Sequence, residues 1–414
     1  MDRLLDTAAH LFWEKGYAAT TTREIAEALQ MRQASLYYHM ASKEDLLYQI
    51  CMSSLRQIRD GIPLEAMEAA EPAERIPILI RSHMAELLKY QERNVTMLTE
   101  LRSLSPRHRA EVVALREKYT SFVRSTLEQA QASGGVRADI PVGYLCLALL
   151  NLLNWSALWF HRDQALSADR LSELFVKIYL EGAVSARARQ ASRSLVLPDF
   201  DARGPKSRAR KMSKPVEIRT EDRLLDAAVA LFSSKGYTAT STREVAALLG
   251  IQKASLYYHI ESKEDLLYLI CKASLEQIHG DVEGSTRNLA DPLERMQALI
   301  STHIESMLRD QDKHATTLAE MHALSQDRLA RVLALRHGYE NLVRSVILGA
   351  QTAGALRDDI DAKYLCLSLL GLMNRVLVWY RPGGRLAPGQ LGQVLGAIFL
   401  SGVGTRGIAS PETR

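Results

Sequence analysis

The chain has 414 residues, of which 47% are hydrophobic, 24% are charged and 6% are aromatic, and its formal net charge is +4. This length predicts two or three domains, each able to bury its own core, and the composition is typical of a soluble helical protein. The apolar run from Leu145 to Phe160 is short and contains Asn151 and Asn154, which favours a buried or interface helix over a membrane span.

Cysteine usage and the first residues of the chain predict a cytoplasmic protein. No CxxC spacing joins the four cysteines, and we expect them to be reduced core residues: Cys51, Cys146, Cys271 and Cys366. Met1 leads directly into an amphipathic helix, without the pattern of a secretory signal.

The chain contains one domain sequence twice. The 50 residues that begin at Asp2 and the 50 that begin at Asp222 are identical at 33 positions without a gap, and the offset of 220 continues to the C-terminus. A repeat of this length indicates a duplicated domain and not a short solenoid unit. We call the two copies repeat one and repeat two.

Helical periodicity predicts an all-α fold for each repeat. In repeat one, the first helix ends at Gly16, the second has its N-cap at Thr21 or Thr22, and a short third helix spans about Arg32 to Met40. The capping-box pattern that starts at Ser42 begins a fourth helix. Longer helical patterns cover residues 78–89, 95–104, 107–129, 139–161 and 167–182, and repeat two follows the same order.

These patterns divide the chain into five segments. Each repeat has an N-terminal helix-turn-helix domain and a C-terminal helical domain, and a basic segment with three prolines joins the repeats; the bounds are 1–55, 56–184, 185–219, 220–275 and 276–408. From Ser185 to Thr220 there are ten Lys/Arg and three Asp/Glu, a local charge of +7. That segment is either a solvated linker or a contact to nucleic-acid phosphate.

The third helix carries the side chains expected to contact DNA. In a helix-turn-helix, this helix enters the major groove and its first residues meet the base edges. In repeat one those residues are Arg32, Gln33 and Ser35, and the following Tyr37, Tyr38 and His39 can reach phosphates. Thr22 and Lys43 lie at neighbouring helix N-termini, which favour phosphate.

The string Gly-Tyr…Thr-Thr-Arg-Glu-Ile-Ala…Ser-Leu-Tyr-Tyr-His…Ser-Lys-Glu-Asp-Leu resembles the N-terminal domain of tetracycline-repressor-like (TetR) regulators, and it occurs twice. The resemblance implies nine helices per repeat, with the last two forming a four-helix interface and a ligand pocket beneath the DNA head. It implies phosphate contacts from Tyr37, His39 and Lys43, and base contacts from Arg32, Gln33, Ser35 and Tyr38. The matching residues of repeat two are Thr242, Gln252, Lys253, Ser255, Tyr257, Tyr258, His259 and Lys263.

Two features of the heads depart from this family. Gln30 stands where the family usually has glycine in the turn, and we expect it to cost repeat one on the order of 1 kcal/mol at positive φ; repeat two has Gly250. The N-cap of the third helix, usually Ser or Thr, is Arg32 or Gln252. We expect the missing cap to cost about 0.5–2 kcal/mol.

The heads also differ from each other, which predicts two related but unequal half-sites. Met31-Arg32-Gln33 corresponds to Ile251-Gln252-Lys253, and Arg or Lys favours guanine whereas Gln favours adenine. A basic arm precedes the second head alone, and we expect it to contact phosphate or the minor groove: Lys206, Arg208, Arg210, Lys211 and Lys214.

The C-terminal parts resemble, more distantly, TetR regulators that respond to acyl-CoA thioesters. This resemblance implies a small-molecule effector, and the candidate ligand residues are His83, Glu100, Trp155, Trp159, His303, Glu320, Arg375 and Trp379. Leu158 and Val378 stand where that subgroup has an arginine. Buried structural roles for the two histidines and interface roles for the two C-terminal tryptophans remain open.

The sequence thus predicts a DNA-binding transcriptional regulator that uses no cofactor. We expect a repressor in which the repeats form an intramolecular pseudo-dimer on a pseudo-palindromic operator. The alternatives are a homodimer of the fused chain with four heads, an enzyme acting on acyl thioesters, and a ligand-binding protein that no longer contacts DNA. No nucleophile–base arrangement, metal-ligand set or phosphate loop is visible in the sequence, so we expect no catalytic and no metal site.

Overall fold

A computed structural model describes residues 2–160, 166–182, 197–198, 200 and 220–402. The described residues form helices and turns and contain no β-strand, so the all-α prediction is confirmed. The predicted joining segment, with its basic arm, lies almost entirely outside the described residues. The chain divides into two compact units: unit 1 is residues 1–183, 367–372 and 398–414, and unit 2 is residues 184–366 and 373–397.

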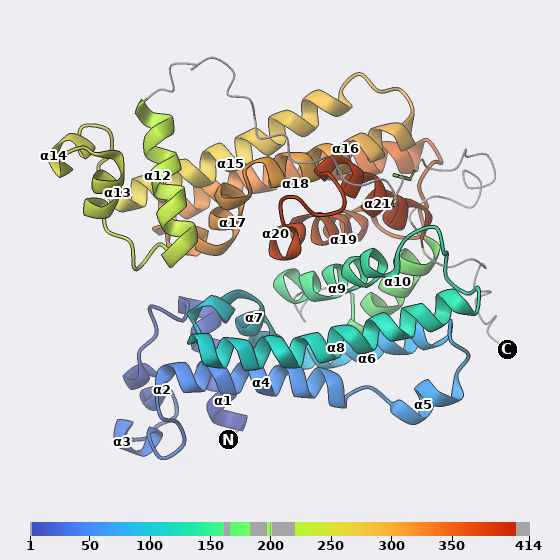
Figure 1. The fold of residues 1–414 in the computed structure, drawn as a ribbon, viewed down its shortest axis with the longest axis horizontal. Helices are drawn as coiled ribbons and strands as arrows, with labels where there is room; N and C mark the ends of the chain where they lie inside the picture. The colour runs from blue at the N-terminus through green and yellow to red at the C-terminus, as the bar shows by residue number, and fades with distance from the viewer. Residues whose placement is uncertain (1, 161–165, 183–196, 199, 201–219, 403–414) are drawn as a thin grey trace. The chain divides into compact units, whose positions relative to one another are not determined.

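The helices of repeat one follow the predicted order with one addition (Figure 1). The first four are α1 (Asp2–Lys15), α2 (Thr22–Ala28), α3 (Gln33–Leu36) and α4 (Lys43–Asp60). Then come α5 (Leu64–Ala69), α6 (Arg75–Lys89), α7 (Gln91–Glu100), the 3₁₀ turn η1 (Leu101–Ser103), α8 (Pro106–Ala132), α9 (Val142–Trp159) and α10 (Ala168–Glu181). The short α5 is the element that the sequence did not predict.

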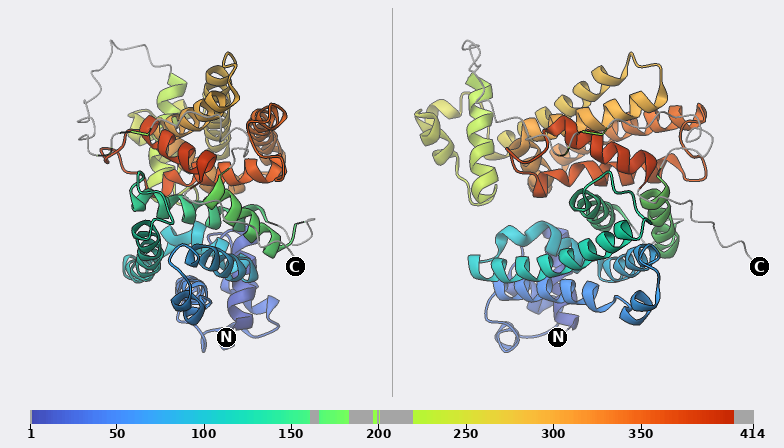
Figure 2. Two further views of the ribbon diagram at one scale, coloured as in Figure 1. Left: turned by 90° about the vertical axis from the view of Figure 1, so that its right-hand side faces the viewer. Right: turned by 45° about the vertical axis from the view of Figure 1, so that its right-hand side comes forward.

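Repeat two, coloured from yellow-green to red in Figure 2, has the same order of helices with two differences. Its head contains α12 (Thr220–Lys235), α13 (Thr242–Leu249) and α14 (Lys253–Leu256). The rest contains α15 (Lys263–Thr286), α16 (Pro292–Arg309), α17 (Gln311–Glu320), the 3₁₀ turn η2 (Met321–Ala323), α18 (Gln326–Thr352), α19 (Ala362–Asn374), α20 (Val376–Trp379) and α21 (Pro388–Ser401). Here α15 is continuous where repeat one has α4 and α5, and α19 and α20 replace the single α9.

Proline chemistry explains the first difference. In repeat one, Gly61 caps α4 and Pro63 follows two residues later, whereas repeat two has Asp281 and Glu283 at these positions. Proline cannot donate the backbone hydrogen bond that a continuing helix needs, and it restricts the residue before it to extended conformations. The chain of repeat one therefore leaves the helix, while α15 continues for another turn and a half.

The core of each head extends into the C-terminal part of the same repeat. In repeat one, side chains of α1, α2 and α4 pack with Met97, Leu104 and Val112 from α7, its following turn and α8. Met321, Leu324 and Val332 do the same in repeat two. The predicted domain boundaries at residues 55 and 275 fall inside α4 and α15, so each head shares a helix and a core with its C-terminal part.

Two segments satisfy a membrane-span test of length and composition: residues 142–159 and 362–379. More than half of each is buried inside the protein, and Tyr179 of α10 donates its hydroxyl to the Leu145 carbonyl of α9 at 2.9 Å. Burial of this kind is typical of a core helix in a soluble protein. The structure thus supports the prediction of a buried helix over residues 145–160.

Candidate nucleic-acid interface

A capping box fixes the start of the second helix in both heads. The Thr21 hydroxyl accepts a hydrogen bond from the Glu24 amide at 3.2 Å, and the Glu24 carboxylate accepts one from the Thr21 amide at 2.8 Å. Lys15 of α1 also binds that carboxylate at 2.9 Å and, with Thr21, lowers the pKa of Glu24 to about 2. Ser241, Glu244 and Lys235 repeat this arrangement, so the first two helices meet at the same corner in each head.

The turn after the second helix has left-handed backbone in both heads. Gln30 has φ 58°, and it is the one described non-glycine residue with positive φ; Gly250 has φ 69°. The amides of Met31 and Ile251 then bond the Ala26 and Ala246 carbonyls at 2.9 and 3.0 Å. The expected positive φ at Gln30 is confirmed, and its cost in stability stays a prediction.

The third helix is shorter than predicted. It spans Gln33–Leu36 and not Arg32 to Met40, because residues 37–39 form a turn in which the His39 amide bonds the Leu36 carbonyl at 2.9 Å. The buried Met40 brings the chain back to the core, and Ser42 starts α4 two residues later. As expected, neither Arg32 nor Gln252 caps its helix with a side-chain hydrogen bond.

The predicted base-contacting and phosphate-contacting side chains gather on the outer surface of each head. Tyr38 and Tyr258 are 89% and 88% exposed, although large aromatic side chains are usually covered. The other exposed members are Arg32, Gln33, Tyr37, His39, Gln252, Tyr257 and His259, while Ser35 and Ser255 are half-buried. The side chain of Lys253 lies outside the described residues.

Hydrogen bonds join the second and third helices at this surface. In repeat one, the Thr22 hydroxyl lies 3.4 Å from the Tyr37 hydroxyl and accepts a bond from the Gln33 amide group at 2.9 Å. In repeat two, the hydroxyls of Thr242 and Tyr257 are 3.2 Å apart. A cluster of hydroxyl and amide donors at a helix N-terminus is suited to a phosphate oxygen.

Lys43 and Lys263, predicted to contact phosphate, are bonded within their own heads. The Lys43 ammonium donates to the carbonyls of Thr20 at 2.7 Å and Tyr17 at 2.8 Å, and it lies 4.4 Å from the centre of the Tyr17 ring. Lys263 makes the equivalent contacts to Thr240 and Tyr237. Burial lowers the pKa of both lysines. A phosphate contact from Lys43 or Lys263 stays a prediction, and it would have to share the ammonium with these carbonyls.

Two carboxylates of repeat one tie its head to its C-terminal part. Glu100, predicted to bind ligand, ends α7 and accepts the amide of Tyr17 at 3.5 Å and the hydroxyl of Ser103 at 3.0 Å. Glu44 of α4 accepts the Ser105 amide at 2.7 Å, and the His108 ring nitrogen lies 2.8 Å away. Although burial opposes ionisation, these bonds hold the pKa of Glu44 below its ordinary value.

Repeat two has the same two contacts. Glu320 accepts the Tyr237 amide at 3.2 Å, and Glu264 accepts the Ser325 amide at 2.8 Å. Glu100 and Glu320 are predicted ligand residues, whereas the roles of Glu44 and Glu264 were not predicted from the sequence. Glu44 and Glu264 occupy matching positions in the two repeats, which could have marked them as candidates. Their partners lie 61 residues away in the sequence, and local periodicity does not relate residues so far apart.

The two histidines predicted to bind ligand lie in the cores. His83 is 1% exposed, its Nδ1 is 2.7 Å from the Tyr119 hydroxyl, and burial lowers its pKa to about 4. His303 lies 2.5 Å from the Tyr339 hydroxyl and 3.1 Å from the Asn374 side-chain oxygen, and burial lowers its pKa to about 3. Both histidines are neutral at pH 7, and no group of side chains among the described residues could hold a metal ion.

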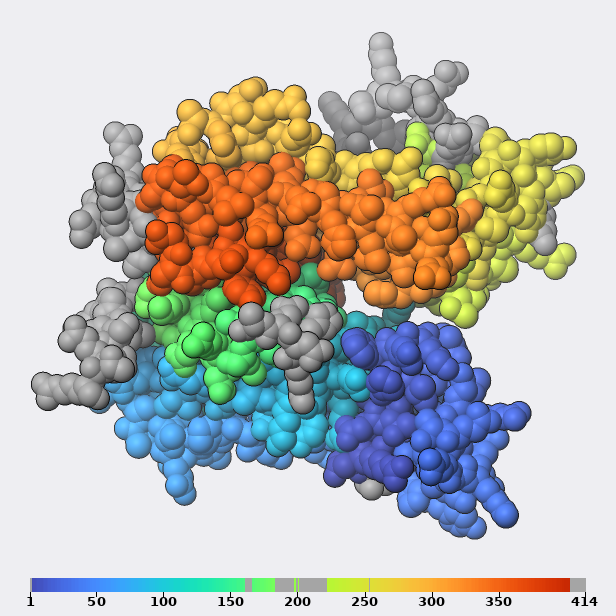
Figure 3. All heavy atoms as spheres, turned by 180° about the vertical axis from the view of Figure 1, so that it is seen from behind, coloured from blue at the N-terminus to red at the C-terminus, as the bar shows by residue number. Residues whose placement is uncertain are grey.

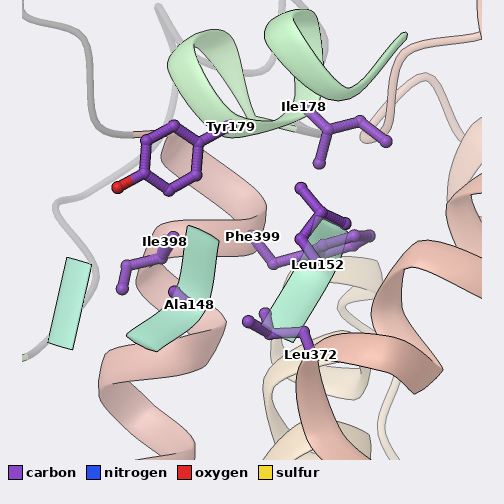
Figure 4. A pocket seen from close by; sticks show the side chains of 7 residues that line it. All are labelled: Ala148, Leu152, Ile178, Tyr179, Leu372, Ile398 and Phe399. Carbon is purple, nitrogen blue, oxygen red and sulfur yellow. The ribbon is translucent and has the colours of Figure 1, made fainter. Parts of the chain in front are cut away.

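The remaining candidates for ligand contact occupy the last helices. Trp155 is buried in α9, Trp159 and Trp379 are half-buried, and Arg375 stands at the break between α19 and α20. Unit 1 also contains a small apolar pocket between α9, α10 and residues 372, 398 and 399 (Figure 4). Its volume of about 10 Å³ has room for one water molecule at most, so it is no effector site.

Comparisons with known proteins match both halves of each repeat. The family described as "Bacterial regulatory proteins, tetR family" matches residues 4–50 and 224–268. "Tetracyclin repressor-like, C-terminal domain" matches residues 69–183 and 289–403.

Known relatives correspond in length to one repeat. The HTH-type transcriptional repressor KstR2 of Rhodococcus jostii is 29% identical over 195 residues, which are 47% of this chain and 92% of that protein. KstR2 of Mycobacterium tuberculosis (strain H37Rv) is 28% identical over 186 residues, 45% of this chain and 93% of that protein. The crystal structure of the regulator PfmR from Thermus thermophilus, 33% identical, covers 43% of this chain and 96% of its own with a TM-score of 0.40.

Proposed function

The chain belongs to the TetR family of DNA-binding bacterial regulatory proteins, and we propose that it represses transcription as a single-chain pseudo-dimer, with one head on each half of a split operator. The observation that carries this proposal is the presence of two complete heads in one chain. The relatives named KstR2 are transcriptional repressors, and their matches cover 47% and 45% of this chain, about the length of one repeat. A two-fold symmetric site is normally bound by two identical chains.

The composition of unit 1 supports pairing within the chain. That compact unit contains residues 367–372 of α19 and the end of α21 from residue 398, together with repeat one. In it, the side-chain amide of Asn151 donates to the Leu372 carbonyl at 3.4 Å. In addition, a Cβ built on Gly371 would lie 2.6 Å from the Trp155 ring, so this close packing requires glycine.

The exposed surface of each head supports the DNA contacts. Figure 3 shows the first head (blue) gathered at one end of unit 1. Tyr38 and Tyr258 are more exposed than any other large hydrophobic residue that the structure describes. A tyrosine can pack its ring against a sugar and donate its hydroxyl to a phosphate. DNA binding would therefore bury an apolar ring that is exposed to water in the free protein.

The mass of the protein in solution tests the pseudo-dimer. We expect light scattering to give a mass near 46.2 kDa, both free and per operator selected from a random DNA library. A mass near twice this value, with four heads per particle, would instead support dimerisation of the fused chain. Failure to select any DNA sequence would contradict the proposed function itself.

We further propose that the two half-sites differ in sequence. Arg32 and Gln33 of the first head correspond to Gln252 and Lys253 of the second. Each bidentate contact discriminates against the wrong base by about 1–3 kcal/mol. R32Q should therefore change the preferred base at one half-site, and the ratio of affinities for the old and new base should change by roughly 5- to 150-fold. Selection with R32Q that returned the wild-type operator would contradict unequal base contacts.

The effector that we propose is a small apolar or acyl ligand, with acyl-CoA thioesters as the class to test first. A ligand shifts the DNA-binding equilibrium only if it binds one arrangement of the heads more tightly than the other. Release of labelled operator should therefore depend on acyl-chain length. Because a regulator need not turn over its effector, thioester concentrations should stay constant during the assay.

A further inference from the structure

A groove on the first head has a basic rim. Its volume is about 180 Å³, and it lies between the start of α1 and the turns on either side of α3; the lining residues are Arg3, Leu4, Leu29, Met31 and His39. Arg3 and His39 are exposed, while Leu4 is buried and the other two pack against the core of the head. The groove thus has an apolar floor, two basic side chains and no carboxylate.

The neighbouring acids of α1 are directed to a different partner. Asp2 and Asp6 bind the guanidinium of the buried Arg93 of α7, with oxygen–nitrogen distances of 3.3 and 2.6 Å. Both carboxylates bond α7, and neither forms an ion pair with Arg3. At the start of α1, the acids therefore bond α7 of the C-terminal part, while Arg3 lines the groove together with His39.

The walls of the groove are fixed by backbone bonds. The Met31 amide bonds Ala26 and the His39 amide bonds Leu36, each at 2.9 Å, and Leu4 anchors the start of α1 in the core. The basic groups therefore project from a rigid frame. Such a frame reduces the conformational entropy that a ligand must overcome to hold them.

The chemistry of the groove favours one phosphate group over a larger ligand. Pockets for drug-sized molecules are about 300–1,000 Å³, which is larger than this groove. A guanidinium presents two parallel donors to a phosphate, and a neighbouring imidazole can add a third. The apolar floor can pack against the deoxyribose next to that phosphate.

We propose that Arg3, together with His39, binds one backbone phosphate of the operator beside the half-site, and that Arg223 with His259 does the same in the second head. This proposal rests on the proposed function, since it adds contacts to the same DNA. Repeat two has Arg223, Leu224, Leu249, Ile251 and His259 at the five positions, and only methionine to isoleucine differs. Arg223 and His259 are exposed there as well.

Salt dependence of operator binding tests this assignment. The variants are R3A, R223A and the double variant, and the control is K118A, which removes an exposed charge on α8 far along the chain from the heads. Because each phosphate contact releases counterions, R3A and R223A should each lower the slope of log K against log salt by about 0.9, and the double variant by about 1.8. Affinity should fall several-fold for every DNA sequence alike, and K118A should match the wild type.

The outcomes separate this inference from the proposed function. An unchanged slope in R3A and R223A, with wild-type operator binding intact, would overturn the phosphate contacts. A changed base preference in R3A would indicate a base contact and would overturn them too. R3K tests the bidentate geometry, since a lysine should keep the slope but lower the affinity. If the wild-type protein bound no selected DNA, the proposed function would fail instead; far-ultraviolet circular dichroism confirms that each variant is folded.

Discussion

The two repeats hold their heads with different charged residues. In repeat one, the buried guanidinium of Arg93 joins α7 to Asp2 and Asp6 of α1. Repeat two has Lys313 in that place, and its ammonium turns to Gln277 of α15 at 2.9 Å. Among the described residues, repeat two has no such arginine–carboxylate bond, and its first helix is joined to α17 by the Ser233 hydroxyl, which donates to Asp312 at 3.0 Å.

Repeat two has an arginine at another junction, where repeat one has a histidine. Arg328 of α18 binds Asp265 of α15 at 2.6 Å and lies 3.9 Å from Glu264, where repeat one has His108 beside Glu44. The acid equivalent to Asp6 is Asp226, and burial raises the pKa of its carboxyl group. The hydrophobic core thus preserves the shared fold, while charged side chains determine which helix of the head is bonded to the C-terminal part.

Removing the α1–α7 connection should give the largest effect. We expect Arg93→Ala to destabilise repeat one by about 2–3 kcal/mol, because it removes several hydrogen bonds between a guanidinium and carboxylates. Lys313→Ala, the matched change, should cost about 1 kcal/mol or less, since its partners are partly exposed. Urea denaturation measures the change in the free energy of unfolding of the whole chain. Hydrogen exchange of peptides from α1 and α12 then shows which repeat is destabilised. Equal losses would contradict the difference between the junctions.

The two repeats also differ in their buried histidines. Among the described residues, repeat two buries His303 and His314, with pKa values lowered to about 3 and 4, chiefly by desolvation. Repeat one buries His83, and Asn94 takes the position of His314. Because the folded pKa lies below the unfolded value of about 6.5, this stability is complete above pH 6.5 and is lost as the pH falls toward the folded pKa.

His314→Asn should therefore make repeat two less sensitive to acid. When the pH is lowered from 7.5 to 5.5, each histidine that stays neutral in the folded state lowers the free energy of unfolding by about 1.4 kcal/mol. Over the same pH interval, the decrease in the free energy of unfolding should be about 1.4 kcal/mol smaller in the variant than in the wild type. The variant also lacks the hydrogen bond between Ser274 and His314, which lowers its stability at every pH. The test compares the pH dependence and not the absolute stability. An identical pH dependence would contradict a neutral His314 in the folded protein.

Local patterns in the sequence predicted the helices well and the junctions poorly. The second helix of each head was predictable because its cap, Thr21 or Ser241, and its Glu24 or Glu244 lie three residues apart. The third helix was overestimated because a buried Met40 can continue a helix or end a turn, and only packing decides. Pairs such as Arg93 with Asp6 or Glu44 with Ser105 join residues 61–87 positions apart, which periodicity does not relate.

The smallest effect concerns the turn before the third helix. Gln30 has φ 58° in repeat one and Gly250 has φ 69° in repeat two. A side chain with a Cβ is strained in left-handed backbone, so Gln30→Gly should stabilise the first head by about 1 kcal/mol, reduced by the greater flexibility of glycine in the unfolded chain. Gly250→Ala is the matched reverse change and should destabilise the second head by a similar amount, because no atom within 4 Å would obstruct its Cβ and the strain is therefore conformational alone. Hydrogen exchange of residues 22–40 and 242–260 would measure both effects. A loss of stability in Gln30→Gly would mean that the gain in unfolded-state freedom outweighs the relief of strain, and that the first head is no more strained at this turn than the second.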